Sequence, residues 1–286
     1  MRGTVSAGMA LALHELGVVS AFDAVYGSSA GAITGAWLLS STPEGLRGWA
    51  DPDYARTLIR WSALLRGRPV VDVRTLVEVV YQTEFPMDFD SVLASPVGYH
   101  PLGTDAETGE STDLRPLIAN PVELRLALRA SASLPFLAGP PVELRGRRFY
   151  DAGVAESIPF RTPLAQGATH VLILRSRRPL ARGGAGQPPD GSLITRPPRS
   201  IRILTRTTLR NESLALRAAL LTRRVRTIAD VARITAREAE GTALTIYPPA
   251  TTPPVSRLTT DSRLLSGALE SGREAARTVL APGRAL

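Results

Sequence analysis

The chain has 286 residues and contains no cysteine and no lysine, few aromatic residues and no long apolar run. Without cysteine it has no disulfide, no thiolate metal ligand and no cysteine nucleophile. No apolar run reaches the roughly 18 residues needed to span a bilayer, so we expect no transmembrane helix. His14 and Glu15 interrupt the first apolar segment too early for a secretory signal peptide. These absences fit a cytoplasmic protein.

The absence of lysine makes all 34 basic residues arginine, and the net charge is +8. A positive surface favours anionic partners such as phospholipid headgroups, nucleic acid or acidic substrates. Aromatic residues make up 5% of the chain and no nucleic-acid-reading motif is present, so nucleic acid is not expected as a partner. A solvated basic face is the default interpretation. Peripheral contact with an anionic membrane surface is the more specific alternative.

The alternation of predicted strands and helices indicates an α/β fold, in which a mixed sheet is covered on both sides. Strands are predicted at 22–26, 97–103, 142–150 (a hairpin), 171–174 and 243–247. The apolar run at 171–174 is typical of a strand buried on both faces. Helices are predicted at 4–16, 30–39, 124–131 and 262–280, with mostly helical chain from Pro43 to Phe89. In that last stretch, we expect packing roles for Trp49, Trp61 and Tyr81.

A long helix is also predicted after a Gly- and Pro-rich segment at 181–198, which we expect to form a mobile loop. Apolar residues at helical spacing are expected to form one face of this helix. They are Leu214, Ala218, Leu221, Val225, Ile228 and Ala232. Core packing with solvated arginines on the other faces is one interpretation, and contact with a membrane is the other.

The most informative motif is Gly27-Ser28-Ser29-Ala30-Gly31, a G-x-S-x-G between a predicted strand and a predicted helix. Glycines two positions either side permit a sharp turn that presents the serine oxygen and lets the helix pack close to the strand. Ser29 then lies at a helix N-terminus, where free N–H groups and the helix dipole favour negative charge. The motif predicts a serine nucleophile, and a glycine-rich turn before a core helix is the alternative.

A serine nucleophile needs a base, and two candidates remain open. His170 follows Asp151 in the Ser…Asp…His order of α/β-hydrolases, but it immediately precedes a predicted core strand. Asp151 ends the predicted hairpin, and the small Ala152 and Gly153 allow another segment to approach it. A carboxylate in an apolar surround has a raised pKa and can act as a general base. On local grounds, Asp151 is equally well explained as a turn-stabilising residue.

Taken together, the elbow around Ser29 and the Asp151-Ala152-Gly153 segment resemble the patatin-like phospholipase family, whose catalytic dyad is Ser–Asp. Three further segments are similar to this family: 131–135 (SASLP), 104–106 (TDA) and 156–159 (ESIP). The resemblance covers residues 1–177 and, more loosely, the C-terminal helices. The family usually has D-G-G or D-G-A, so Ala152 is a departure, tolerable where no positive φ is required.

The resemblance implies a three-layer α/β/α sandwich of patatin type with a mostly parallel central sheet. It implies a single domain over 1–286, with a core at 1–177, the loop at 181–198, and C-terminal helices and a strand at 199–286. Ser29 would be the nucleophile and Asp151 the base, in the hydrolysis of lipid carboxylic esters through an acyl-enzyme. No metal or organic cofactor is implied. A histidine-based hydrolase, a non-catalytic lipid-binding homologue and an acyltransferase with the same dyad are the alternatives.

The family's glycine-rich oxyanion loop, G-x-G-x-x-G, is only partly present, because Arg2-Gly3 resembles its end. The resemblance implies an oxyanion and elbow set of Arg2, Gly3, Gly27, Ala30 and Gly31. Either the chain lacks a strand and most of this loop, or Met1 is an internal methionine. Removing a buried strand leaves backbone groups of its neighbours unpaired, so we expect an in-frame upstream strand followed by glycines. Sequencing the N-terminus of the native protein tests this expectation.

Overall fold

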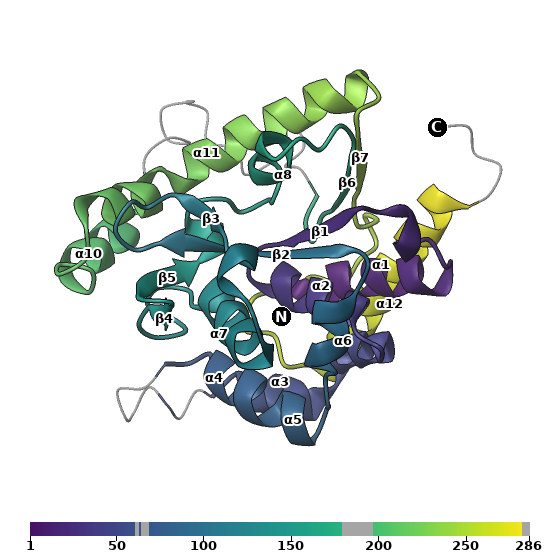
Figure 1. Cartoon of the computed structure of the whole chain (residues 1–286), viewed down its shortest axis with the longest axis horizontal. Helices are drawn as coiled ribbons and strands as arrows, with labels where there is room; N and C mark the ends of the chain where they lie inside the picture. Colours follow the sequence, from purple (N-terminus) through teal and green to yellow (C-terminus); the bar gives the residue numbers. More distant parts are fainter. Residues whose placement is uncertain (61–62, 64–68, 179–196, 282–286) are drawn as a thin grey trace.

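The computed structural model describes residues 1–60, 63, 69–178 and 197–281, and every structural statement below refers to these residues (Figure 1). Trp61 and most of the predicted 181–198 loop lie outside the described residues. No helix of the described part is both long and apolar enough to cross a membrane.

The strands form two sheets. In the five-stranded sheet, β1 (Ala24–Gly27) pairs in parallel with β2 (Gly98–Asp105), which continues to β5 (Arg147–Asp151) and β4 (Val142–Leu144). The pairs β2–β5 and β4–β5 are antiparallel, and β3 (Ser111–Asp113) also pairs antiparallel with β2. The second sheet is the parallel pair of β6 (Val171–Leu174) and β7 (Ala243–Ile246). Parallel strands therefore form the centre of the fold, and antiparallel strands form one edge.

The helices enclose these strands in layers (Figure 1). The longer ones are α1 (Gly3–Glu15), α2 (Ala30–Leu39), α7 (Pro121–Ala132), α10 (Arg199–Thr207), α11 (Leu214–Ala239) and α12 (Ser262–Leu280). The shorter ones are α3 (Pro52–Leu58), α4 (Val73–Thr75), α5 (Tyr81–Thr83), α6 (Phe89–Ala94) and α8 (Arg161–Ala165).

The alternation of side chains along β6 shows the three layers directly. Ile173 packs in a cluster with Ile234 of α11 and with Phe160. Leu172 and Leu174 point the other way, into a cluster built from α1 and α12. Because successive side chains of a strand face opposite sides, this sheet is sandwiched between two helical layers. The predicted α/β/α fold is confirmed.

Close helix packing holds α1 against α12, and two glycines permit it. A Cβ on Gly8 would lie 1.9 Å from the Leu269 carbonyl oxygen, and one on Gly272 would lie 2.0 Å from that of Val5. Real Cβ atoms do not approach this closely, so only glycine allows these backbones to touch. The apolar, small-residue character of α1 is therefore explained by burial between α2 and α12.

Most predicted elements occur where the sequence places them, with three differences. The stretch from Pro43 to Phe89 is a series of short helices, including a 3₁₀ segment at 43–50 and a π segment at 76–80. Residues 104 and 105, expected in a turn, extend β2 because they pair with β5. In β6, predicted to be buried on both faces, only Ile173 is buried. Trp49 and Tyr81 are buried packing residues, as predicted.

The predicted apolar face of α11 is wrong. Its buried residues include Leu216, Ala219, Leu220 and Ile234, whereas Leu214, Val225 and Ile228 are exposed. Three residues of the predicted face, Leu221, Ile228 and Ala232, line a large cleft. The helix crosses from one end of the molecule to the other, so different faces meet neighbours along its length (Figure 1). Helical periodicity alone could not locate those changes of neighbour.

That cleft separates the two sheets. Among the described residues, β1 pairs only with β2 and β6 only with β7. Ala24, Val25 and Tyr26 of β1 and all four residues of β6 line the same cleft. Two strand edges with unpaired backbone groups therefore lie on its walls. This gap is also why β6 is less buried than its apolar sequence predicts.

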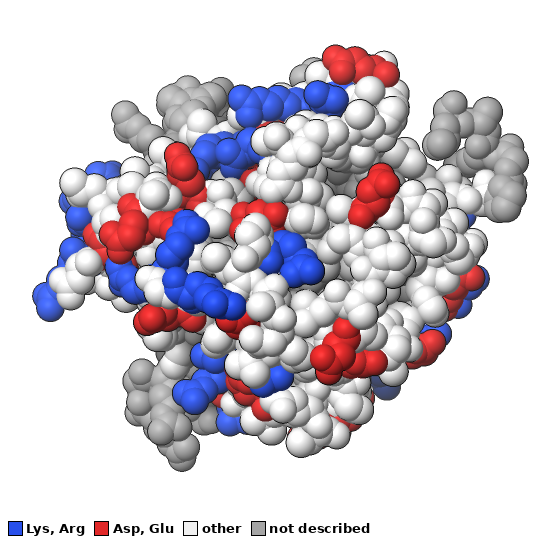
Figure 2. Space-filling model, viewed as in Figure 1, with Lys and Arg blue, Asp and Glu red and all other residues white. Residues whose placement is uncertain are grey.

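Charge on the surface is mixed rather than uniformly basic. On the face in Figure 2, arginines gather along α11, and acidic residues are interspersed with basic ones over the neighbouring elements. Many of the arginines form ion pairs, such as Arg148 with Glu107 and Arg56 with Asp53. Exposed pairs of this kind contribute about 0–1 kcal/mol each. Contact with an anionic membrane stays a prediction.

Candidate active site

The turn between β1 and α2 holds Ser29 in a strained conformation. Its φ of 58° and ψ of −124° lie in a region that residues with a side chain rarely adopt. Such strain costs about 1–3 kcal/mol and persists only where the surrounding structure enforces it. A Cβ on Gly27 would lie 2.4 Å from Cα of Ala32, so the turn requires glycine there. A Cβ on Gly31 would meet nothing within 4 Å, so the steric role predicted for Gly31 is wrong.

The turn brings Ser29 into contact with Asp151, 122 positions later in the chain. Ser29 Oγ donates a hydrogen bond of 2.6 Å to Asp151 Oδ2. Asp151 is the last residue of β5, and its Oδ1 accepts from the backbone N–H of Gly153 at 2.7 Å. The carboxylate is thus held by one backbone donor while its second oxygen faces the serine. The two residues that the sequence pairs as nucleophile and base are direct hydrogen-bond partners.

Burial sets the acidity of Asp151. The side chain is only 3% exposed, and this desolvation raises its pKa. The hydrogen bond from Ser29, the charges of Arg223 and Arg257 and the Gly153 N–H oppose the rise but do not cancel it. A raised pKa makes the carboxylate a stronger proton acceptor than an ordinary aspartate.

The reactivity of Ser29 is expected to fall as the pH is lowered through this raised pKa, because a carboxylate accepts a proton only when ionised. The rate of labelling by a serine-directed fluorophosphonate, followed from about pH 4 to 8, measures this. The labelling rate should decline with pH as expected for the titration of a single group. The same decline should be seen in His170→Ala. A decline centred near pH 6.5 and absent from His170→Ala would instead indicate an imidazole base.

The other family-like segments lie around Ser29 and Asp151. Ser131 Oγ accepts from the backbone N–H of Ser29 at 3.0 Å, and so fixes the strained residue from α7. Thr104 Oγ1 donates to the Asp151 carbonyl at 2.8 Å and accepts from the Ala155 N–H at 3.1 Å. Ala152, where the family usually has glycine, begins a 3₁₀ turn and does not have a positive φ, so its methyl group is tolerated.

The buried Glu156 ties the next loop to the elbow. Its side chain accepts from the backbone N–H groups of Phe160, Arg161 and Thr162, and from Thr162 Oγ1. Its carbonyl accepts from Ser28 Oγ at 3.1 Å. The carboxylate therefore organises a turn rather than reaching Ser29, and the Glu156 carbonyl links this turn to the elbow through Ser28.

Candidate backbone donors for a developing oxyanion lie at two helix N-termini. Ala30 and Gly3 are the first residues of α2 and α1, where N–H groups have no intrahelical partner. A Cβ on Gly3 would lie 2.7 Å from Cβ of Ala30, so glycine lets the start of α1 approach the elbow this closely. The sequence predicts Arg2-Gly3 in a loop, but Gly3 already belongs to α1. The start of α1 and the elbow nevertheless lie side by side, and the oxyanion role of Arg2 and Gly3 stays a prediction.

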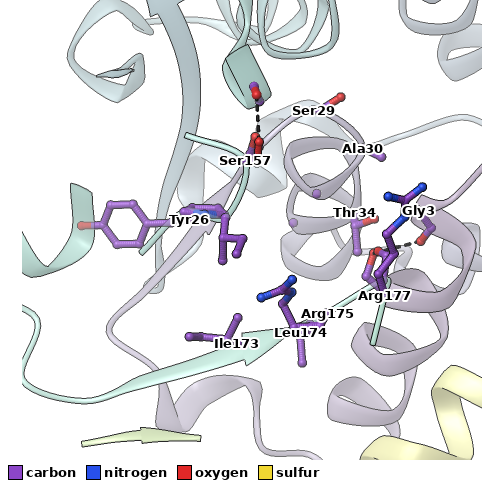
Figure 3. A pocket seen from close by; sticks show the side chains of 18 of the residues that line it. Gly3, Tyr26, Ser29, Ala30, Thr34, Ser157, Ile173, Leu174, Arg175 and Arg177 are labelled. Atoms are coloured by element: carbon purple, nitrogen blue, oxygen red, sulfur yellow. Dashed lines mark hydrogen bonds between the residues drawn. The ribbon is translucent and has the colours of Figure 1, made fainter. Parts of the chain in front are cut away.

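Ser29 and Asp151 line the cleft of about 2460 Å³ that separates the sheets. Figure 3 shows Ser29 and Ser157 at one end of this cavity, with Ile173, Leu174 and Arg175 at the other. Apolar side chains from several elements line it as well. They include Ile33, Leu38, Leu58, Leu76, Leu134 and Leu137. The site is thus accessible to a ligand with a long apolar portion.

None of the three histidines contacts Ser29. His170 is exposed and its Nδ1 lies 3.2 Å from Thr169 Oγ1. His100 stacks on Tyr26, with 4.5 Å between ring centroids, and its Nδ1 lies 2.8 Å from Asp113. His14 lies near Glu44. No group of three or more His, Asp or Glu side chains that could hold a metal ion occurs in the described part of the chain.

Sequence reasoning missed two kinds of site residue. Ser131 belongs to a segment noted only for its family likeness, and its contact with the Ser29 N–H depends on tertiary structure. Arg177, Arg223 and Arg257 also line the cleft, and the charges of Arg223 and Arg257 act on Asp151. They come from three distant segments among 34 basic residues, so nothing in the local sequence distinguishes them.

Comparison of the sequence with models of known protein families shows which family the chain belongs to. The sequence model of the family described as patatin-like phospholipase matches residues 1–164, more than half of the chain. The chain belongs to the patatin-like phospholipase family. A search of curated proteins finds no match. Membership supports a hydrolytic enzyme of lipid metabolism. The matched region ends after Asp151 and includes the elbow, the hairpin and the segments that surround them.

Proposed function

We propose that the protein hydrolyses carboxylic esters of lipids through an acyl-enzyme on Ser29, with Asp151 as general base. The observation that carries the proposal is the 2.6 Å hydrogen bond from Ser29 Oγ to a buried carboxylate with a raised pKa. Nucleophile and base within hydrogen-bond reach are the geometric requirement for nucleophilic catalysis. Family membership supports a lipid as the substrate.

In the first half of the reaction, Ser29 Oγ attacks the ester carbonyl carbon while its proton passes to Asp151. Negative charge develops on the carbonyl oxygen, and the N–H groups of Ala30 and Gly3 are the candidate donors to it. The tetrahedral intermediate collapses with cleavage of the bond to the alcohol oxygen. That oxygen takes the proton from Asp151 and leaves as the alcohol, and the acyl group remains on Ser29.

In the second half, Asp151 accepts a proton from a water molecule that attacks the acyl carbon. Collapse of the second intermediate returns the proton to Ser29 Oγ and releases the carboxylic acid. The apolar lining of the cleft is suited to the acyl chain, because burying each methylene group contributes about 0.8 kcal/mol. The long apolar lining and the dyad therefore support a fatty acyl ester over a small polar ester.

The test is covalent labelling by a fluorophosphonate with an alkyl chain, followed by identification of the modified peptide by mass spectrometry. The adduct is expected on Ser29 and on no other serine, and an excess of a medium-chain monoacylglycerol should slow its formation. Lipid binding without any adduct on Ser29 would contradict the proposal and would favour a non-catalytic lipid-binding protein. Release of fatty acid from the same monoacylglycerol separates hydrolysis from labelling alone.

A further inference from the structure

Four arginines from distant segments converge on the cleft beside the dyad. Arg2 precedes α1, Arg177 follows β6, Arg223 lies on α11, and Arg257 lies in the segment before α12. All four line the same cleft as Ser29 and Asp151. Because the four arginines come from separate segments, a single basic helix face does not explain why they lie together.

Within the described part of the chain, these four arginines have no carboxylate within ion-pair distance to neutralise them. None of the four forms an ion pair with a carboxylate among the described residues, whereas Arg161 pairs with Asp230 and Arg147 with Asp105. The side-chain hydrogen bond described for Arg223 is from Nε to Ser157 Oγ, a neutral group, at 3.2 Å. Asp151 is the carboxylate whose charge acts on Arg2 and Arg257.

The four guanidinium groups are close enough to act on one another. Burial, followed by the charges of Arg257, Arg177 and Arg223, lowers the pKa of Arg2 to about 9. Mutual repulsion of this kind is relieved when an anion enters between the cations. Asp151 alone cannot balance the cluster, and its carboxylate is already engaged by Ser29 and the Gly153 N–H.

The cluster lies at the reacting end of the cleft. One terminal nitrogen of Arg223 is 3.2 Å from the position a Cβ on Gly153 would occupy, two residues after Asp151. In Figure 3, the side chain of Arg177 rises beside Gly3, which itself packs against Ala30 of the elbow. Ser176 Oγ donates to Ser6 Oγ at 3.1 Å, so the end of β6 is fixed against α1. A ligand whose ester reaches Ser29 therefore has its polar end among these arginines.

We propose that Arg2, Arg177, Arg223 and Arg257 bind a phosphate monoester carried by the substrate, so that the preferred substrates are acyl esters with an anionic phosphate headgroup. The assignment rests on the proposed ester hydrolysis at Ser29. Guanidinium groups bind phosphate oxygens in bidentate geometry, and several of them suit a dianion. A zwitterionic choline headgroup places a quaternary ammonium in the same cationic surround, and a glycerol headgroup supplies no charge.

The test measures binding without turnover, by calorimetry on Ser29→Ala with two non-hydrolysable ether lipids. One is 1-O-octyl-glycerol-3-phosphate and the other is 1-O-octyl-glycerol, both below their micellar concentrations. The phosphate lipid is expected to bind at least about tenfold more tightly, since charge-assisted hydrogen bonds to phosphate are the strong ones. Equal affinity for the two lipids would overturn the proposal.

Arginine variants locate the phosphate. Adding Arg223→Gln or Arg257→Gln to Ser29→Ala should each reduce the preference for the phosphate lipid about tenfold. Because the preference is a ratio, changes in the acidity of Asp151 or in acyl-chain binding largely cancel. Arg263→Gln is the matched control, since Arg263 is exposed on α12 and does not line the cleft. A preference unchanged in both variants, or equally reduced by Arg263→Gln, would overturn the assignment.

Inorganic phosphate distinguishes a headgroup site from a site for the free anion. It should displace the phosphate lipid only weakly, because it lacks the alkyl chain that the cleft binds. If inorganic phosphate bound as tightly as the phosphate lipid, the headgroup assignment would be overturned. Failure of the proposed function is detected by a different measurement, the absence of the fluorophosphonate adduct on Ser29. In that case, binding of the phosphate lipid would still depend on the arginines.

Discussion

Removing either member of the Ser29–Asp151 pair should eliminate most of the catalysed ester hydrolysis. Asp151→Asn is expected to lower kcat about 10⁴-fold, and Ser29→Ala by at least as much. Asparagine keeps the size of the side chain but cannot accept the serine proton. The measurement is the initial rate of fatty acid release from a medium-chain monoacylglycerol, with each variant purified in the same way.

The double variant separates a functional dyad from two independent residues. Because nucleophile and base act as one unit, Ser29→Ala with Asp151→Asn should be no slower than the slower single variant. His170→Ala is the control, and its kcat should stay within about threefold of the unchanged protein, because the exposed His170 does not contact Ser29. Retained activity in Asp151→Asn together with loss in His170→Ala would establish the histidine-based alternative.

The stability of Asp151→Asn shows whether its loss of activity has a trivial cause. Since folding raises the pKa of Asp151, the native state favours the protonated carboxyl, and stability from this group is lost as the pH rises through the folded pKa. Asparagine does not ionise, so the variant does not lose stability in this way as the pH rises. The variant should therefore be at least as stable as the unchanged protein at pH 7, and its advantage should be smaller below pH 4.

The sequence predicts elements and pairings that depend on local chemistry. The helix at 30–39 matches the prediction, because the elbow glycine and the apolar run that follows define it locally. Asp151 is predictable because the hairpin and two small residues mark its position. These features are encoded within a few residues of where they act.

What the sequence does not predict depends on neighbours brought from elsewhere. The buried face of α11 is set by which elements lie under each turn, so Leu216 and Ile234 are buried while Val225 is exposed. Arg177, Arg223 and Arg257 come together only when three segments pack against one another in the folded chain. The periodicity of apolar residues in the sequence does not predict that packing. The contact of Ser131 with the Ser29 N–H is of the same kind.

The open edges of β1 and β6 predict that a strand placed between them increases both stability and reactivity. Both edges line the cleft and are unpaired among the described residues, so an added strand would satisfy backbone donors and acceptors on two sides. The start of α1 lies beyond the carboxyl ends of both strands, since Gly3 packs against Ala30 and Ser6 bonds to Ser176. A strand joined to Met1 by a short turn would thus run parallel to β1 and bring new N–H groups to Ser29.

The Met1 amine adds a second reason for the same expectation. Burial, Arg2 and Arg257 lower the pKa of this amine to about 5, so a charge there is unfavourable. A peptide bond at Met1 replaces the ionisable amine by a neutral N–H group, so folding at neutral pH no longer has to remove a proton from it. It also leaves the Ser256 and Arg257 carbonyls, which accept from the amine, within reach of a backbone N–H.

Two extensions of equal length, fused before Met1, test the prediction. One encodes a short apolar strand followed by a glycine-rich turn, and the other a Ser- and Pro-rich segment that cannot pair with a sheet edge. The strand extension should raise the Tm by at least about 5 °C, and the fluorophosphonate labelling rate about 100-fold if the turn supplies an oxyanion donor. Equal behaviour of the two extensions would show that the cleft does not accept a strand. A higher Tm with an unchanged labelling rate would show that the strand pairs but that its turn stays away from the oxyanion.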